Sequence, residues 1–454
     1  MSFSSRNPAT GEILERFDAH TPAHIEERIH IAAHTQQSWK HVPFGERSAL
    51  MYRAAAALES GREEYARTIS LEMGKPVTQA RAEIEKCAWV CRFYADEAER
   101  MLTKERLESD GSESYVRFDP LGVVLAVMPW NFPFWQVFRF AAPALMAGNT
   151  ALLKHASNVP RCALHIEKVF SEAGFPDGCF STLLIPADAV QGVIDHPEVA
   201  AVTLTGSEYA GSQVASKAGA RLKKSVLELG GSDPFIVLAD ADVQRAAKTA
   251  AAARMLNTGQ SCIAAKRFIV EAPVYERFLS EFVSAVAGMR VGDPLDDATE
   301  IGSMAREDLL LELDVQVRRS VEMGARILLG GQRLDRPGAF YAPTVMDQLT
   351  PEMPVLSEET FGPVAAVIAV DDVDAAVAAA NATEFGLGAS VWTEDRVRAT
   401  DMARRIDAGC VFINGMVKSD PRLPFGGVKK SGYGRELSQY GIREFVNIKT
   451  VWIG

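Results

Sequence analysis

Short, continuous apolar runs that alternate with helical segments constrain the fold of this chain more than any other feature. Residues 122–127, 150–154 and 199–205 form three such runs, each bounded by turn residues. A helical pattern of apolar residues at 159–173 lies between the second run and the third. Strands that are apolar on both faces and are joined by helices are typical of a parallel sheet covered on both sides. These runs therefore predict a doubly wound α/β domain.

A second alternation of the same kind follows Gly231. Its candidate strands are residues 234–238, 266–270, 364–370 and 410–414. The chain has 454 residues, which is too many for one ordinary hydrophobic core. We therefore expect a second α/β domain, separate from the first.

The remaining segments show other patterns. From Thr21 to about Arg100, apolar residues recur at helical spacing with an interruption at 74–76, which predicts several amphipathic helices over one face of a sheet. Residues 102–120 are polar and alternate weakly, so we expect a hairpin that pairs outside the domain. The tail at 445–453 alternates apolar and polar residues, which predicts an edge strand that needs a partner.

Composition narrows the class of partner. The formal net charge is −11, and basic residues are dispersed among acids, which argues against nucleic acid or an anionic membrane as partner. The N-terminus lacks the apolar stretch of a signal peptide, and no apolar run approaches the ~18 residues of a membrane span. The six cysteines contain no C-x-x-C pair, which fits a reducing compartment. We therefore expect a cytoplasmic protein that binds small molecules.

Two histidines one helical turn apart raise the question of a metal site. His30 and His34 lie in a polar amphipathic stretch beside Glu26 and Glu27. The sequence contains no H-E-x-x-H motif. We therefore expect no metal ion.

Cys262 and Glu228 form a candidate catalytic pair. Cys262 ends the segment NTGQSC at 257–262, and Glu228 lies in the segment LELGGSDP at 227–234. A thiolate attacks carbonyl carbon well, and a glutamate in an apolar, glycine-flanked turn can act as a general base. Taken singly, a cysteine is more often a small core residue and a glutamate more often a solvated one. The pair alone permits a covalent thioester cycle without establishing it.

Five short motifs together point to a known family. They are PWNFP at 129–133, LELGG at 227–231, GQSC at 259–262, ETFGP at 359–363 and PFGG at 424–427. In this order and spacing, the chain resembles the aldehyde dehydrogenase superfamily from Asn7 to the last expected strand. The resemblance implies two doubly wound α/β domains, one Rossmann-like for the cofactor and one catalytic, with a small β element for oligomerisation.

The same resemblance implies domain boundaries and an assembly. The cofactor-binding domain would comprise residues 1–101, 121–230 and 427–443, and the catalytic domain residues 231–426. The oligomerisation element would comprise residues 102–120 and 444–454, whose strands would extend the sheet of a neighbour. A homodimer or a homotetramer is therefore expected.

The resemblance also gives the candidate pair its roles. Cys262 would attack the aldehyde carbonyl, and the Asn131 amide, with the backbone N–H of Cys262, would hold the oxyanion of the thiohemiacetal. Hydride transfer to a nicotinamide would leave a thioester on Cys262, and Glu228 would activate the water that hydrolyses it. From local sequence, Asn131 can also be a turn residue between two prolines.

The expected cofactor turn departs from the pattern G-x-G-x-x-G. Residues 205–211 (TGSEYAG) follow an apolar run but read G-x-x-x-x-G, which is weak by itself. The turn is similar to a variant in the family, in which Gly206, Ser207 and the following helix N-terminus would meet the pyrophosphate. A simple strand-to-helix turn is the alternative.

Five further residues are assigned to the cofactor by the resemblance. Lys154 would bond the adenosine ribose and Glu359 the nicotinamide ribose, while Phe361 and Trp130 would lie near the nicotinamide site. Ser157 stands where many NAD-preferring relatives carry a glutamate that repels a 2′-phosphate. Because that repulsion is missing, both NAD and NADP are expected to work.

Arg139 and Ser419 are the expected substrate residues. Arg139 stands where the succinate-semialdehyde enzymes of the family carry an arginine, which can clamp a distal carboxylate, and Ser419 matches a serine that binds the same group. A second arginine that many of them carry six residues before the nucleophile is replaced by Leu256. The alternative for Arg139 is an ion pair at a surface or an interface.

The resemblance therefore implies NAD(P)-dependent oxidation of an aldehyde with a distal carboxylate, first of all succinate semialdehyde to succinate. Glutarate semialdehyde and broader medium-chain aldehydes are the alternatives. A CoA-acylating dehydrogenase needs no water-activating base, so Glu228 argues against it. The set Cys262, Asn131, Glu228 and Glu359 argues against a catalytically silent relative, which would not need all four residues.

Overall fold

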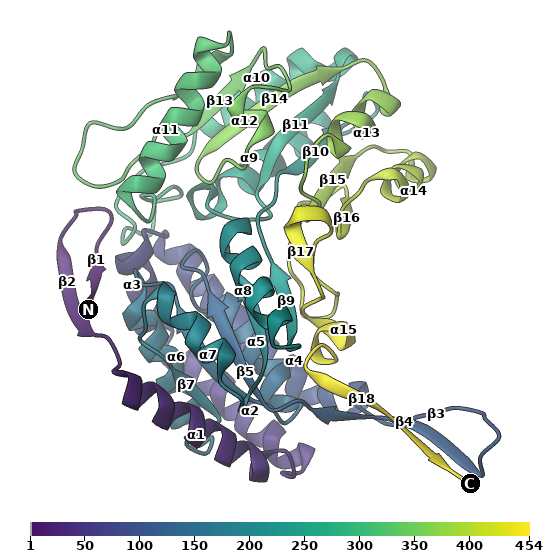
Figure 1. Cartoon of the computed structure of the whole chain (residues 1–454). Helices are drawn as coiled ribbons and strands as arrows, with labels where there is room; N and C mark the ends of the chain where they lie inside the picture. The colour runs from purple at the N-terminus through teal and green to yellow at the C-terminus, as the bar shows by residue number, and fades with distance from the viewer. Residues whose placement is uncertain (1) are drawn as a thin grey trace.

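Two large β-sheets, of six and seven strands, organise the chain. Residues 2–454 are described by a computed structural model, in which the six-stranded sheet lies in the lower half of Figure 1 and the seven-stranded sheet in the upper half. Two small antiparallel sheets lie beside them. The predicted fold class is thus confirmed, while the residue boundaries of the domains stay a prediction.

The six-stranded sheet has the strand order β17-β9-β8-β5-β6-β7. Neighbouring strands are parallel except β17, which runs antiparallel to β9. The strands are β5 (Val123–Met128), β6 (Thr150–His155), β7 (Phe180–Thr182), β8 (Val199–Thr205), β9 (Lys224–Glu228) and β17 (Gly432–Tyr433). The three predicted runs are β5, β6 and β8. The other three strands were missed because β7 and β17 are very short and β9 begins with polar residues.

Side chains of β5 alternate between two hydrophobic clusters. Val123 and Leu125 pack with one set of helices, whereas Val124 and Ala126 pack with a different set on the other face. Successive side chains of a strand point to opposite faces, so a run that is apolar at every position is buried on both sides. This alternation explains why helices cover both faces of the sheet.

The helices around this sheet include the amphipathic series predicted near the N-terminus. Their bounds are α1 (Pro22–Trp39), α2 (Phe44–Ser60), α3 (Arg62–Met73), α4 (Val77–Met101), α5 (Trp135–Met146), α6 (Pro160–Glu172), α7 (Val190–Asp195) and α8 (Glu208–Ala220). The predicted interruption separates α3 from α4, where Gly74 has φ +78° and ends α3. Within residues 2–454, no helix combines the length and apolar character needed to cross a bilayer.

The seven-stranded sheet has the order β12-β13-β14-β11-β10-β15-β16, and only β12 is antiparallel to its neighbour. Its strands are β10 (Asp233–Val237), β11 (Ala265–Glu271), β12 (Arg326–Leu329), β13 (Thr344–Asp347), β14 (Val364–Val370), β15 (Gly388–Trp392) and β16 (Cys410–Ile413). Helices α9 (Val243–Met255) and α10 (Tyr275–Ala287) pack on one face, and α13 (Val373–Asn381) and α14 (Arg396–Arg405) on the other. Helices α11 (Glu307–Glu322) and α12 (Pro354–Ser357) pack together against side chains of β13 and β14. All four predicted strands of this half are present.

A three-stranded arm projects from the body, at the lower right of Figure 1. It pairs β18 (Val446–Ile453) with β4 (Glu113–Pro120) over their whole length, and β4 with β3 (Glu105–Arg106). The predicted tail strand thus finds its partner in the predicted hairpin segment of the same chain. A second hairpin, β1 (Ser2–Arg6) with β2 (Ile13–Asp18), was not predicted.

A buried ion pair fixes the start of α5 against the helical layer. Lys75 pairs with Glu83 of α4, and both side chains are almost completely buried. The other carboxylate oxygen of Glu83 accepts hydrogen bonds from the backbone N–H groups of Phe134, at 2.9 Å, and Trp135, at 3.0 Å. The carboxylate thereby satisfies free donors at the positive end of a helix. It anchors the segment that carries Asn131 and the first residues of α5.

This arrangement predicts a large loss of stability for Glu83→Gln. The change leaves the buried Lys75 ammonium without its countercharge, which typically costs about 3–5 kcal/mol. Urea denaturation measures the free energy of unfolding. Glu85→Gln is the matched control, because Glu85 lies on the same helix in an exposed pair with Arg62 and should change stability little. Equal losses in the two variants would contradict the role of the buried pair.

Candidate active site

The carboxyl edge of the six-stranded sheet gathers residues that are far apart in the sequence. Asn131 follows β5, Lys154 lies near the end of β6, Ser207 follows β8, and Glu228 ends β9. Neighbouring parallel strands end at the same edge, and open α/β sheets bind ligands there. Four of the predicted site residues therefore share one edge because of the topology.

Cys262 reaches this edge from the other large sheet. It lies in the loop between α9 and β11, beside a cavity of about 360 Å³. Asn257 and Thr258, earlier in this loop, both have φ +56°, a region that β-branched residues rarely adopt. Thr258 Oγ1 accepts a hydrogen bond from the Gly302 N–H at 3.0 Å. Such contacts hold the unusual backbone path that leads to the thiol.

Hydrogen bonds tie Asn131 to the cysteine loop. Asn131 Nδ2 donates to the Gln260 carbonyl oxygen at 3.2 Å, and Asn257 Nδ2 donates to the Asn131 carbonyl oxygen at 2.8 Å. Asn257 Nδ2 also donates to the Gln260 carbonyl oxygen at 2.9 Å. The Asn131 amide, which is expected to bind an oxyanion, thus contacts the loop at Gln260, two residues before Cys262.

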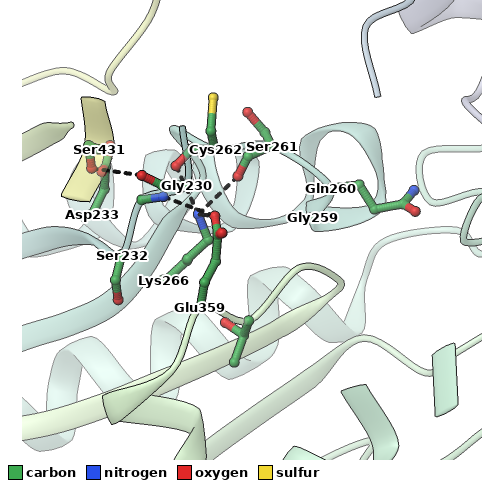
Figure 2. A network of polar contacts seen from close by, with 12 residues as sticks. Gly230, Ser232, Asp233, Gly259, Gln260, Ser261, Cys262, Lys266, Glu359 and Ser431 are labelled. Atoms are coloured by element: carbon green, nitrogen blue, oxygen red, sulfur yellow. Dashed lines mark hydrogen bonds and ion pairs between the residues drawn. The ribbon is translucent and has the colours of Figure 1, made fainter. Parts of the chain in front are cut away.

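Lys266, at the start of β11, joins the cysteine loop to the ETFGP motif. Its Nζ donates to the carbonyl oxygens of Ser261, at 3.0 Å, and Cys262, at 2.8 Å, and pairs with Glu359 at 3.2 Å. Glu359 in turn accepts a hydrogen bond from the Gly231 N–H at 3.0 Å. Figure 2 shows this network and the Cys262 thiol pointing away from Lys266. The network holds the loop while leaving the sulfur free.

The charges around Cys262 act on its thiol in both directions. Burial raises the pKa of Cys262 to about 12, and Glu228 and Glu359 add to this, whereas Arg139 and Lys266 oppose it. The thiol is therefore protonated at neutral pH in this structure. Attack on a carbonyl requires a base that takes the proton.

Glu228 is a buried carboxyl group whose oxygens have no hydrogen-bond partner among residues 2–454. Burial, and next the carboxylate of Glu436, raise the pKa of Glu228 to about 8, while Arg139 opposes the shift. Gly426 leaves room for this carboxyl group, because a Cβ atom at that position would lie 2.8 Å from Glu228 Oε1 and 2.8 Å from the Gly434 carbonyl oxygen. A carboxyl group that titrates near the working pH is suited to general base catalysis.

Arg139, on α5, lines the same cavity as Cys262 but already has a carboxylate partner. Its Nε pairs with Glu436, and both side chains are buried. Its guanidinium lies 4.9 Å from the centre of the Phe425 ring, and the backbones of Phe425 and Glu436 are hydrogen-bonded to each other. Arg139 is therefore in an ion pair, but this pair is buried at the cavity wall and is not the surface or interface pair that was the alternative.

Ser419 also lines the cavity, and it is paired with a residue that was not predicted. Ser419 Oγ accepts a hydrogen bond from Lys86 Nζ at 2.8 Å. Leu256, at the position of the missing arginine, lines the cavity as well. The structure thus brings all the predicted substrate positions into one cavity with Cys262.

Lys154 and Ser157 line a second cavity, of about 860 Å³. Lys154 has no ion pair within residues 2–454, and burial lowers the pKa of its ammonium. Ser207 caps α8 by accepting a hydrogen bond from the Ala210 N–H at 3.3 Å, and the Gly206 N–H is bonded to the Glu228 carbonyl oxygen. A roomy cavity with a free ammonium at the carboxyl edge fits the adenosine part of a dinucleotide.

Trp130 and Phe361 lie together near Glu359. Their rings meet edge to face, with centroids 5.7 Å apart and planes at 85°. Lys266 Nζ lies 6.0 Å from the centre of the Phe361 ring. The two aromatic side chains expected near the nicotinamide are thus packed against each other beside the cysteine loop.

Three residues with a place in the site were not predicted, namely Lys86, Lys266 and Glu436, and no role was predicted for a fourth, His155. His155 lies at the end of β6, where its Nε2 contacts the Pro133 carbonyl oxygen at 2.8 Å and burial lowers its pKa to about 4. Lys266 carried a usable signal, because a lysine that opens a buried strand is unusual. Lys86 and Glu436 carried none, since each lies in a stretch that reads as polar and solvated.

One cluster of possible metal ligands lies away from this site. Atoms of Glu26, His30 and His196 come within 4.8 Å of one another at the surface. His30 and His196 each contact Glu26, at 3.2 and 3.1 Å, as ordinary ion pairs do. The expectation of no metal ion stays a prediction.

Comparisons with known proteins show the family of the chain. The model of the aldehyde dehydrogenase family matches residues 1–451. A probable succinate-semialdehyde dehydrogenase [NADP(+)] of Synechocystis is 53% identical over 453 residues, and succinate-semialdehyde dehydrogenase [NADP(+)] 1 of Mycobacterium tuberculosis is 51% identical over 456, each match covering 100% of both chains. The crystal structure of succinic semialdehyde dehydrogenase from Streptococcus pyogenes with NADP+ superposes with a TM-score of 0.97 at 37% identity, covering 99% of both chains. This chain belongs to the aldehyde dehydrogenase family.

Proposed function

We propose that the protein oxidises an aldehyde with a distal carboxylate, first of all succinate semialdehyde, to the acid with NADP or NAD. The observation that carries this proposal is a single cavity lined by Cys262, Arg139 and Ser419. The nucleophile and the groups expected to hold a carboxylate therefore face the same space. The names of the relatives from Synechocystis and M. tuberculosis support the same substrate class.

In the proposed cycle, the Cys262 sulfur bonds to the aldehyde carbon after a base takes the thiol proton. The Asn131 amide and the Cys262 backbone N–H donate to the oxygen, on which negative charge develops. A bound nicotinamide cofactor supplies the acceptor for the hydrogen and electron pair that leave the carbon. The thioester that stays on Cys262 is then attacked by water, whose proton passes to Glu228, and the carbon–sulfur bond breaks to release the carboxylate.

The residues proposed to hold the cofactor fall into two groups. Lys154, Ser157 and the Gly206–Ser207 turn would contact the adenosine ribose and the pyrophosphate, and Glu359, Phe361 and Trp130 the nicotinamide end. Ser157 is exposed in the cavity wall and carries no charge that would repel a 2′-phosphate. The NADP(+) in the names of the relatives supports the use of NADP.

Arg139 is proposed to act on the substrate while it stays paired with Glu436. The buried carboxylate fixes the guanidinium in one orientation at the cavity wall, which is the benefit of a preorganised donor. Because the pair is close to neutral as a whole, its attraction for a second carboxylate is reduced. Binding of the substrate carboxylate therefore requires at least one further hydrogen-bond donor in the cavity.

We also propose a homodimer or homotetramer in the cytoplasm. The arm formed by β3, β4 and β18 carries exposed apolar side chains, among them Ile448, Trp452 and Ile453. Exposed apolar strands at a sheet edge are often covered by another chain. The domain boundaries at 1–101, 121–230, 231–426 and 427–443 are proposed on the same basis of family likeness.

The activity itself predicts a clear preference among aldehydes. With purified protein, we expect kcat/KM for succinate semialdehyde to exceed that for hexanal by about tenfold or more, which corresponds to 1.4 kcal/mol. Glutarate semialdehyde tests the length of the cavity, and reactions with and without CoA test the acyl acceptor. A preference for hexanal, or a product that appears as a CoA thioester, would contradict the proposal.

The pKa of Glu228 predicts a pH dependence of thioester hydrolysis. The group acts as a base only when ionised, so the steady-state rate should rise with pH, reach half its maximum near the pKa of about 8 and level off above it. Stopped-flow absorbance separates this rate from the first turnover of cofactor reduction. In Glu436→Gln the rise should move to lower pH, because a negative neighbour is lost and Arg139 is left unpaired. An unchanged profile in this variant would rule out Glu228 as the titrating group.

The role of Ser157 predicts a change of cofactor preference. Ser157→Glu should raise KM for NADP by roughly tenfold or more, since a carboxylate would face the 2′-phosphate, while KM for NAD should change little. Initial rates with each cofactor measure the effect. Ser157→Gln has a similar size without the charge and serves as the control. Equal effects of the two variants on KM for NADP would mean that bulk, not charge, is responsible.

A further inference from the structure

Lys86 presents a cation to the Cys262 cavity without a carboxylate partner among residues 2–454. It lies on α4 and lines the cavity together with Gln79, Ala82 and Glu83. These positions recur at the spacing of one helical face, so the wall of the cavity is a continuous stripe of α4. Glu83, the acidic member of the stripe, is committed to Lys75. The charge of Lys86 is therefore available to a ligand.

The other two cations that line the cavity are less suited to bind an anion. Arg139 is already paired with the buried Glu436. Lys418 is exposed, so water and salt screen its charge. Lys86 is half-buried and differs from both, because its ammonium is shielded from bulk water and lacks a countercharge.

Two contacts hold the Lys86 ammonium in place. Its Nζ donates to Ser419 Oγ at 2.8 Å and lies 4.0 Å from the centre of the Trp135 ring. An ammonium has three N–H donors, and a hydroxyl that accepts one hydrogen bond still has its own proton to donate. Lys86 and Ser419 together can thus give one hydrogen bond to each oxygen of a carboxylate.

We infer that Lys86, acting with Ser419, binds the distal carboxylate of the substrate and supplies the positive charge that Leu256 does not. This inference rests on the proposed function, because it assumes an aldehyde that carries a carboxylate. Burial and the nearby Arg139 charge lower the pKa of Lys86 to about 8, so the ammonium is still protonated at neutral pH. A bound carboxylate would favour the same charged form.

The test replaces Lys86 by methionine, which keeps a flexible apolar stem against Trp135 and removes the charge. We expect Lys86→Met to raise KM for succinate semialdehyde by roughly tenfold or more, with kcat changed little, because a charge-assisted hydrogen bond is lost. KM for hexanal should change by less than about twofold, since hexanal has no carboxylate. Lys86→Arg should restore much of the affinity for succinate semialdehyde.

Lys418→Met is the matched control, because it removes the same charge from an exposed position of the same cavity. We expect it to change KM for succinate semialdehyde far less than Lys86→Met does. Binding of succinate as a competitive inhibitor gives a readout independent of turnover, and its inhibition constant should rise in Lys86→Met only.

Different results would contradict the proposed function and the proposed role of Lys86. If the wild-type protein prefers hexanal to succinate semialdehyde, the proposed function is wrong. If Lys86→Met leaves the ratio of kcat/KM for succinate semialdehyde to that for hexanal unchanged, Lys86 does not bind the carboxylate, whatever the best substrate is. Equal losses with both aldehydes would make Lys86 a packing residue and would overturn the inference as well.

Discussion

The site depends on two buried cations, Lys266 and Arg254, that hold the catalytic loop through backbone carbonyl oxygens. Lys266 binds the carbonyls of Ser261 and Cys262, and Arg254 binds those of Gly259, at 3.3 Å, and Thr360, at 3.2 Å. A buried charge is costly unless it is compensated. The backbone carbonyl dipoles stabilise the two buried cations, and the same hydrogen bonds fix the conformation of the loop. Cys262, the proposed nucleophile, and the segment proposed to hold the cofactor are thereby held together.

A second set of charges tunes the chemistry around the nucleophile. Glu228 and Glu436 are both buried, yet among residues 2–454 only Glu436 is in an ion pair, with Arg139. The unpartnered carboxyl group is the one whose pKa rises to about 8 through burial and the adjacent carboxylate. Arg139 therefore has two effects, since it stabilises Glu436 and, through its charge, limits the shift at Glu228. Because Arg139 is already paired, we propose Lys86 as the partner of a substrate carboxylate.

Much of the fold could be predicted because parallel strands are encoded locally. The run 199–205 coincides with β8, since each of its residues is apolar or small and both faces of the strand are buried. The cysteine, the glutamate and the arginine of the site were also predicted, because they lie in short motifs. Cys262 and Arg139 line one cavity, and Glu228 acts on Cys262 through its charge, an arrangement that depends on the packing of distant segments and that no single motif contains.

The residues that were missed depend on contacts between distant segments. Glu436 is placed against Arg139 by the backbone pairing of its own segment with Phe425. Lys86 lies on an amphipathic helix, where a lysine is ordinarily solvated, and only the packing of α4 beside the cavity gives it a ligand-facing position. No local pattern distinguishes such residues from surface charges.

The central claim is that Cys262 carries the acyl group as a thioester and that Glu228 is needed to release it. Mass spectrometry of Glu228→Gln after a brief exposure to succinate semialdehyde and NADP tests this directly. We expect one succinyl group per chain, on the peptide that contains Cys262, and none in Cys262→Ser. Full turnover by Glu228→Gln without an adduct, or an adduct on another residue, would contradict it.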